Sequence, residues 1–282
     1  EVFRVGEEVL TATFEKFAPD GASVTAAPYP VISYKEAMLQ FGSDKPDLRN
    51  PLRIMDVTDF FQRCTFKPFL KRTVRAIRVH ADMSKGFHEK LLKFATSIGM
   101  GGLGYLEVME DKSYKGPIDK FIPDDMKQEF AELTGLEVGD TIFFIADKEE
   151  RANLFAGQLR NELGERLDLI EKNAFRFCFV NDFPMYEYNK DEKKMDFTHN
   201  PFSMPQGGLE ALNAMNPEDI LAYQYDIVCN GVELSSGAVR NHDLDIMVKA
   251  FEIAGYSEEN LKTKFGALYN AFQFGVPPHA GM

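Results

Sequence analysis

The sequence predicts an α+β protein, and three observations support this prediction. Apolar residues make up 44% and charged residues 27% of the 282 residues, which is enough for packed cores. Helical and strand patterns alternate between about residues 55 and 171, as expected of an α+β unit that closes on itself. Further along the chain, two β-rich runs flank Asn230-Gly231, the preferred pair for a two-residue antiparallel hairpin.

Composition narrows the class of protein before any motif is considered. Acidic residues outnumber basic ones by 44 to 32, for a net charge of -12, which argues against a broad basic face for nucleic acid. Three widely spaced cysteines form no CxxC pair, so we expect a reducing compartment rather than a disulfide framework or a zinc site. No apolar run approaches the ~20 residues that span a bilayer, and no signal peptide is visible.

The first fifty residues predict two helices separated by irregular chain. Apolar residues recur at helical spacing between Glu7 and Phe17. After a proline-interrupted stretch, Ser33 and Glu36 form a capping box that opens a helix ending near Phe41. Residues 42–49 are charged and rich in turn-forming residues, so a loop is expected there.

The middle of the chain predicts strands and helices with recognisable ends. Ser84 is a helix N-cap, and Gly99 with its neighbouring glycines ends that helix. Pro123, followed by two aspartates, suits the first turn of another helix. The expected strands cover 74–80, 103–109 and 141–145, and the expected helices cover 58–63, 84–98, 123 onward and 148–163.

The remaining chain predicts a strand, the hairpin and C-terminal helices. A buried strand is expected at 175–180, followed by irregular chain at 195–205. Asn216 and Pro217 are expected to begin a helix. The hairpin strands are expected at 225–229 and 232–239, and the final helices at 245–254 and 258–272.

The expected hairpin puts two carboxylates on one face of a sheet. With Cys229 opposite Val232, alternation groups four residues on a polar face: Asp226, Val228, Glu233 and Ser235. The opposite face, which we expect to be buried, holds Ile227, Cys229, Val232 and Leu234. Asp226 and Glu233 are then diagonal neighbours with backbones about 7–8 Å apart. Two such carboxylates can bind one Mg²⁺ together with phosphate oxygens. The alternative is a solvated face with two unrelated acids.

Arg240 joins these acids only if the strand contains an irregularity. It follows Glu233 by seven residues, so strict alternation points it to the opposite face. A bulge at Ser236-Gly237 would restore convergence, because glycine within a strand often marks a bulge. His199 stands in an irregular segment, and its alternative interpretation is a surface-loop histidine. The sequence contains no HExxH, Gly-x-Ser-x-Gly, Walker or dinucleotide-binding motif.

A series of short motifs resembles bacterial-type aspartyl-tRNA synthetase in order and spacing over nearly the whole chain. The matching segments are 42–49 (GSDKPDLR), 182–184 (DFP), 199–202 (HNPF), 226–233 (DIVCNGVE), Arg240 and 277–281 (PPHAG). The resemblance implies part of a class II aminoacyl-tRNA synthetase fold, an antiparallel sheet with flanking helices. Residues 1–54 and 172–282 would form a discontinuous part of this catalytic domain, and residues 55–171 an inserted α+β domain.

The resemblance also implies an activity and a set of site residues. The intact enzyme would use ATP to activate L-aspartate and transfer it to the 3′ end of tRNA. It would be a cytoplasmic homodimer that does not associate with a membrane. His199 would contact the bound aspartate, and Arg240 would bind its side-chain carboxylate. Asp226 and Glu233 would hold Mg²⁺, with Glu233 also binding ATP. Catalysis would rest on these binding residues through positioning and charge stabilisation.

Departures from the family pattern shape the remaining expectations. Asn200 stands where many relatives have a second histidine, and 235–238 (SSGA) replaces a Gly-Gly-Gly-Ser run. The family's anticodon-binding domain and first two motifs are not recognised here, and its third motif would follow Met282. We therefore expect a fragment that is inactive by itself. One alternative is an independent binding module, built on the inserted domain, that could touch tRNA. A synthetase for asparagine or lysine is disfavoured by the insertion.

Overall fold

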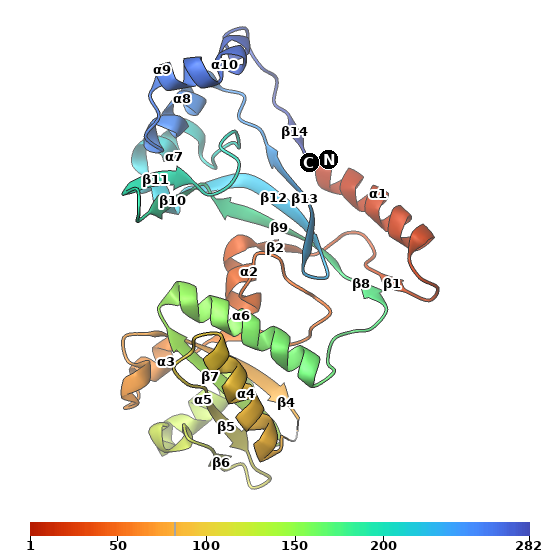
Figure 1. Ribbon diagram of the computed structural model, residues 1–282, viewed down its shortest axis with the longest axis vertical. Coiled ribbons are helices and arrows are strands. Elements are labelled where there is room, and N and C mark those ends of the chain that lie inside the picture. The colour runs from red at the N-terminus through yellow and green to blue at the C-terminus, as the bar shows by residue number, and fades with distance from the viewer. Residues whose placement is uncertain (82) are drawn as a thin grey trace. The chain divides into compact units, whose positions relative to one another are not determined.

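The computed structural model describes residues 1–81 and 83–282, which form two compact units (Figure 1). Unit 1 consists of Glu1–Lys35 and Asn173–Met282, and unit 2 of Glu36–Lys172. Along the chain, the first boundary between the units lies between Lys35 and Glu36, before the predicted domain boundary at residue 55. The physical reason is that the loop before that boundary packs within unit 2, where a Cβ on Gly42 would approach the backbone N of Gly157 to 2.5 Å. That the middle region is an inserted domain stays a prediction.

The sheet of unit 1 is mainly antiparallel, as predicted, with its strands in the order β14-β13-β12-β9-β2. Only the pairing of β2 with β9 departs from this pattern within the sheet's described strands, since it is parallel. The strands are β2 (Val31–Ser33), β9 (Phe177–Pro184), β12 (Leu221–Cys229), β13 (Val232–Val239) and β14 (Ala280–Gly281). β12 lies at the centre and is almost entirely buried, so its side chains are held firmly on both faces.

Helix α1 (Val2–Phe17), at the right in Figure 1, packs Phe3, Leu10 and Phe14 against one face of this sheet. It begins five residues before the predicted Glu7, and Phe3 stacks on Phe179 of β9 with ring centroids 3.9 Å apart. Gly6 allows the helix to lie close to β12, because a Cβ at this position would be only 3.3 Å from the Ile227 side chain. The short strands β1 (Ser23–Val24) and β8 (Ala174–Phe175) pair in parallel beside this helix.

Shorter elements gather at the other end of the unit 1 sheet (Figure 1). They are the strands β10 (Tyr186–Asn189) and β11 (Lys194–Phe197) and the helices α7 (Gly208–Ala214), α8 (Leu244–Ile253), α9 (Glu258–Lys264) and α10 (Gly266–Phe272). The single helix predicted at 258–272 is divided at Phe265, whose backbone is not helical, and Gly266, a poor helix former, begins the second part. The helix predicted from Asn216 is only a 3-10 turn, Pro217–Asp219, because the chain enters β12 directly afterwards.

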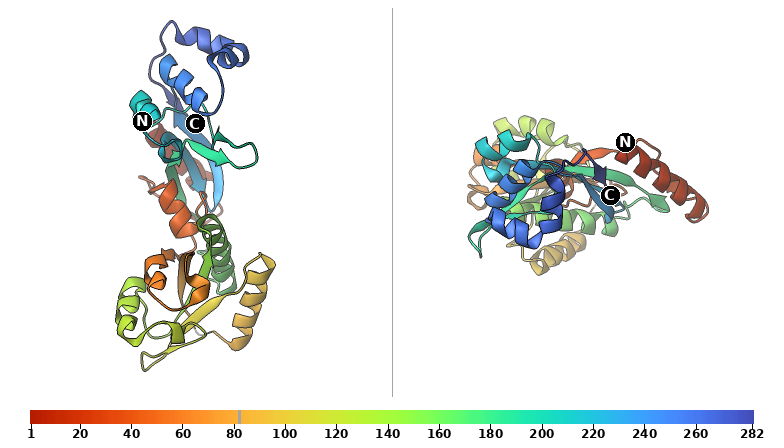
Figure 2. Two further views of the ribbon diagram at one scale, coloured as in Figure 1. Left: turned by 90° about the vertical axis from the view of Figure 1, so that its left-hand side faces the viewer. Right: turned by 90° about the horizontal axis from the view of Figure 1, so that it is seen from above.

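Unit 2 is an α+β layer structure with its own hydrophobic cores. Its sheet has the order β3-β4-β7-β5-β6 and is antiparallel throughout its described pairs. The strands are β3 (Ile54–Asp56), β4 (Thr73–His80), β5 (Gly104–Val108), β6 (Tyr114–Lys115) and β7 (Asp140–Asp147). α4 (Lys85–Ser97) and α6 (Glu149–Arg166) cover one face, and α3 (Thr58–Gln62) and α5 (Lys127–Thr134) the other (Figure 2).

Several local predictions for residues 33–126 are confirmed. Ser84 caps α4, its side chain accepting a hydrogen bond from the Phe87 N–H. Helix α2 (Tyr34–Phe41) ends at Phe41, as expected, and α5 begins after Pro123 through a 3-10 turn at Asp124–Met126. Further 3-10 turns cover Lys67–Phe69 and Asp119–Phe121. Among the residues described in either unit, no helix has both the length and the apolar character needed to cross a membrane.

Candidate functional site

The predicted hairpin is present and its turn is anchored to the sheet. Asn230 and Gly231 connect β12 to β13 with φ values of 53° and 81°, the left-handed conformation that a type I′ turn requires. The Asn230 side chain accepts a hydrogen bond from the Arg176 N–H at 2.9 Å and donates one to the Ala174 carbonyl at 2.8 Å. Asn230 therefore forms the turn and also holds the hairpin to the chain at residues 174–176.

The irregularity predicted within this hairpin is present, but at a different residue. Val228 pairs with Glu233, whereas Ile227 pairs with Ser235, which leaves Leu234 as the extra residue of a β-bulge. The predicted bulge at Ser236-Gly237 is therefore wrong, and Asp226 faces Ser236 rather than Ser235. The bulge can sit here because the Leu234 side chain, 42% exposed, is not needed in a core.

The predicted division into faces also changes beyond the bulge. Ser235 joins Ile227 on the face away from the carboxylates, while Ser236 takes its place beside Asp226. Val232 and Leu234 were expected to be buried, but they are 58% and 42% exposed. The apolar character of a β-strand residue does not by itself show that another layer covers it.

One cavity of about 120 Å³ brings together all four residues that the sequence singled out. Asp226, Glu233, Arg240 and His199 line it, and Gln224 of β12 lies among them. The single extra residue at the bulge makes this possible, because it offsets the odd spacing between Glu233 and Arg240. The cavity therefore combines two carboxylates, a guanidinium and an imidazole.

These groups differ in burial. Asp226 is 7% exposed, Arg240 is half-buried, and Glu233 and His199 are exposed. The His199 ring packs edge-on against Phe183, with centroids 4.9 Å apart. Two carboxylates and a guanidinium in one cavity can bind a ligand that carries both positive and negative charge.

Arg240 is held by chain segments that are distant in sequence. Its backbone N–H donates to the His279 carbonyl at 2.9 Å, and it bridges to Ser203 in antiparallel fashion. On the other side of the sheet, the Tyr225 hydroxyl donates to the Gly281 carbonyl at 3.0 Å. Burial raises the pKa of Tyr225, and the nearby positive charge of Arg240 opposes that rise. The 277–281 motif thus supports the position of the arginine.

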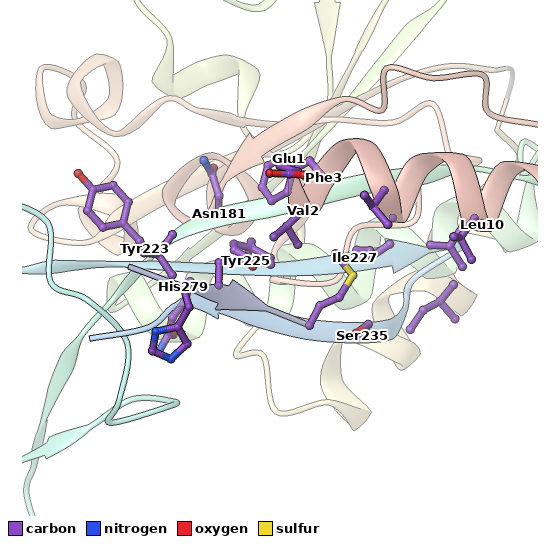
Figure 3. A pocket seen from close by; sticks show the side chains of 18 of the residues that line it. Glu1, Val2, Phe3, Leu10, Asn181, Tyr223, Tyr225, Ile227, Ser235 and His279 are labelled. Atoms are coloured by element: carbon purple, nitrogen blue, oxygen red, sulfur yellow. The ribbon is translucent and has the colours of Figure 1, made fainter. Parts of the chain in front are cut away.

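A much larger cavity, of about 1080 Å³, lies on the opposite face of the same sheet (Figure 3). Val2, Phe3 and Leu10 of α1 line it together with Tyr225 and Ile227 of β12. Its lining is mainly apolar, so it lacks the arrangement of opposite charges found in the smaller cavity. This cavity depends on where α1 lies on the sheet, so local sequence patterns do not predict it.

Gln224 and Phe183 also line the smaller cavity, although neither was predicted as a site residue. The signal for Gln224 was available, since it precedes Asp226 by two positions and therefore shares its strand face. Within the described residues, no group of three or more histidine, cysteine or acidic side chains could hold a metal ion. Asp226 and Glu233 are two carboxylates, a set that suits Mg²⁺ when substrate phosphates complete the coordination.

Comparison with known proteins gives a consistent result over the whole length. A family model described as tRNA synthetases class II (D, K and N) matches residues 1–282. The chain is 51% identical over 288 residues to the Aspartate–tRNA(Asp/Asn) ligase of Gluconobacter oxydans, and 50% identical over 289 residues to that of Ehrlichia chaffeensis. It is 49% identical over 293 residues to the ligase of the same name from Rickettsia akari. Each alignment covers 100% of this chain and 48% of the relative, so the chain spans about half the length of these relatives.

Proposed function

Because the chain belongs to the class II tRNA synthetase family (D, K and N), we propose that it is part of an aspartate–tRNA ligase. The relatives are named as ligases for tRNA(Asp/Asn), and we extend both tRNA substrates to the protein that contains this chain. The observation that carries the proposal is the cavity in which His199, Asp226, Glu233 and Arg240 meet. These residue types match an amino-acid substrate with two carboxylates and a nucleotide with three phosphates.

The residues of the cavity divide into two proposed groups. Arg240 binds the side-chain carboxylate of aspartate through the paired N–H groups of its guanidinium, and His199 contacts the same substrate. Asp226 and Glu233 hold Mg²⁺ with ATP, and the ion, when bound, neutralises charge on the phosphates. The carboxylates support this assignment because they share one sheet face and one cavity.

The proposed reaction has two steps. The α-carboxylate of aspartate attacks the α-phosphorus of ATP, forming aspartyl-adenylate as pyrophosphate leaves. A ribose hydroxyl at the 3′ end of tRNA then attacks the activated carbonyl, and AMP leaves. The residues of this chain contribute mainly by holding the aspartate in position, which makes the first attack effectively intramolecular.

Arg240 also provides a basis for choosing aspartate over asparagine. The neutral amide of asparagine would leave the guanidinium without a carboxylate, so a desolvated charge would be left unpaired. A site that depends on such a pair can discriminate strongly against an isosteric neutral ligand.

The organisation of the protein is part of the same proposal. Residues 55–171 are a domain inserted into a catalytic domain to which residues 1–54 and 172–282 belong. The complete ligase is a cytoplasmic homodimer, and the 282-residue chain by itself is inactive. The alternative of an independent binding module rests on the separate cores of unit 2. Residues 36–172 contain 24 acidic and 21 basic residues, however, so the positive excess that favours tRNA binding is missing.

Aspartate-dependent ATP–pyrophosphate exchange tests the proposed function. We expect exchange from the full-length protein with aspartate and much less with asparagine, and none from the isolated chain. An absence of exchange from the full-length protein would overturn the ligase proposal. Salt-dependent tRNA binding by the isolated chain would instead favour the binding module, and a lack of binding at low salt would remove it.

A further inference from the structure

Residues 200–206 link the ends of the two hairpin strands beside the cavity. Met204 donates from its N–H to the Val239 carbonyl at 2.9 Å and accepts at its own carbonyl from the Tyr223 N–H at 2.9 Å. Just beyond the end of β13, the Asn241 N–H donates to the Phe202 carbonyl at 2.8 Å. This segment, here termed the connector, is therefore bonded to the chain on both sides of the cavity. His199 immediately precedes it.

Gln224 joins the start of the connector to the central strand. Its side-chain nitrogen donates to the Asn200 carbonyl at 3.0 Å and to the Ser203 hydroxyl at 2.8 Å. A primary amide nitrogen carries two hydrogens, so these two bonds use both of them. Gln224 is 5% exposed and Ser203 is 0% exposed, which excludes water as an easy substitute for either bond.

The two acceptors connect Gln224 to both ends of the proposed aspartate site. Asn200 is adjacent in sequence to His199, and Ser203 pairs with Arg240 across an antiparallel bridge. Gln224 itself lines the cavity two positions from Asp226. One buried side chain therefore constrains the backbone that carries the histidine and the backbone that carries the arginine.

We propose that Gln224 is a positioning residue that sets the separation of His199 and Arg240 for aspartate. This inference rests on the proposed function, because it assumes that those two residues bind the substrate. Binding groups must be held within a fraction of an ångström of the productive geometry, and buried hydrogen bonds to the supporting backbone accomplish this. Gln224 acts through the connector and has no assigned contact with ATP.

The test replaces Gln224 with leucine in the full-length protein. Gln224→Leu keeps a side chain of similar size and removes both donors. We expect KM for aspartate in ATP–pyrophosphate exchange to rise about 3- to 30-fold, as expected for one or two lost hydrogen bonds. KM for ATP should stay within about twofold, because Asp226 and Glu233 remain on their strands.

Two further variants separate positioning from general stability. Ser203→Ala removes only one of the two acceptors, and we expect a smaller rise in KM for aspartate. In the double variant, the effects should be less than additive, because both changes remove the same bond. Gln206→Leu is the matched control, since Gln206 donates to Asp182 at 2.6 Å from the far end of the connector. Its KM for aspartate should be unchanged.

The outcomes distinguish this inference from the proposed function. An unchanged KM for aspartate in Gln224→Leu, with or without a lower melting temperature, would overturn the positioning role alone. An equal rise for aspartate and ATP would also overturn it, because that result indicates a general disturbance. If Gln224→Leu does not fold, an unchanged KM in Ser203→Ala would contradict the inference. A wild-type protein without aspartate-dependent exchange would overturn the proposed function together with the inference.

Discussion

Glu233 and Arg240 line the same cavity although seven residues separate them along the chain. In a regular strand this odd spacing would place them on opposite faces. Leu234, the extra residue of the bulge, shifts the alternation of side chains between the two faces by one position. With this odd spacing, the carboxylate and the guanidinium share a face only if one residue between them is left out of the pairing, and that residue is Leu234, whose side chain is 42% exposed.

Deleting Leu234 should leave the cavity residues on one face. The pairs Val228–Glu233 and Ile227–Ser235 would become consecutive, so regular pairing would continue without moving Arg240 to the other face. We expect the amide contacts between Asp226 and Ser236 to persist in NMR spectra of the chain, with a stability loss of about 1–2 kcal/mol. Loss of those contacts would place the irregularity elsewhere in the strand.

Glu233→Gln should impair ATP use far more than folding. The change removes a negative charge from the exposed end of the acid pair while preserving the size of the side chain. In the full-length protein we expect exchange at limiting ATP–Mg²⁺ to fall about 100-fold, because hydrogen bonds and metal contacts to charged groups are the stronger ones. The melting temperature of the chain should hardly change.

A matched control for this prediction is Glu187→Gln. Glu187 is exposed on β10 and does not line the cavity, so the exchange rate should be unaffected. If Glu233→Gln behaved like the control, its assignment to ATP and Mg²⁺ would be wrong.

Arg160→Met should destabilise unit 2. Arg160 is 1% exposed, and its guanidinium donates to the carbonyls of Leu52, Asn50 and Asp47 at 2.7, 2.7 and 2.9 Å. Burial lowers its pKa to about 10, so it remains charged near neutral pH. Removing it takes this donor from the Asp47 carbonyl and leaves the Asn50 and Leu52 carbonyls with the Arg53 guanidinium alone, so we expect a loss of about 2–4 kcal/mol in chemical denaturation.

The control on the same helix is Arg166→Met. Arg166 is partly exposed and pairs with Glu162 one turn earlier, an arrangement worth about 0.5 kcal/mol or less. Equal destabilisation by the two variants would show that the loop contacts of Arg160 have no special importance.

The cysteine thiols should be unreactive in the folded chain. Cys64, Cys178 and Cys229 are buried, and burial raises the pKa of Cys178 to about 12. Thiolate is the nucleophilic form, so at about pH 8 alkylation by iodoacetamide should be very slow. Mass spectrometry should detect no modification before denaturation and three modified residues after it. Rapid native labelling of Cys178 would contradict its buried environment.

Local sequence signals predicted the elements whose causes are local. The Asn230-Gly231 turn, the Ser84 cap and the helix that ends at Phe41 were all confirmed, because each depends on a few neighbouring residues. The same kind of signal failed at Asn216, where capping residues lead only to a 3-10 turn. There the entry of the chain into a central strand decided the conformation.

The sequence by itself determined the α+β class, the position of the hairpin and the residue types of the candidate site. Turn preference and side-chain alternation are properties of short segments, so they can be read without a structure. Only the tertiary structure decided that the bulge lies at Leu234 and that Gln224 joins the connector to β12. A bulge is chosen by the packing of both faces of a sheet, and a buried hydrogen bond depends on segments that meet only after folding.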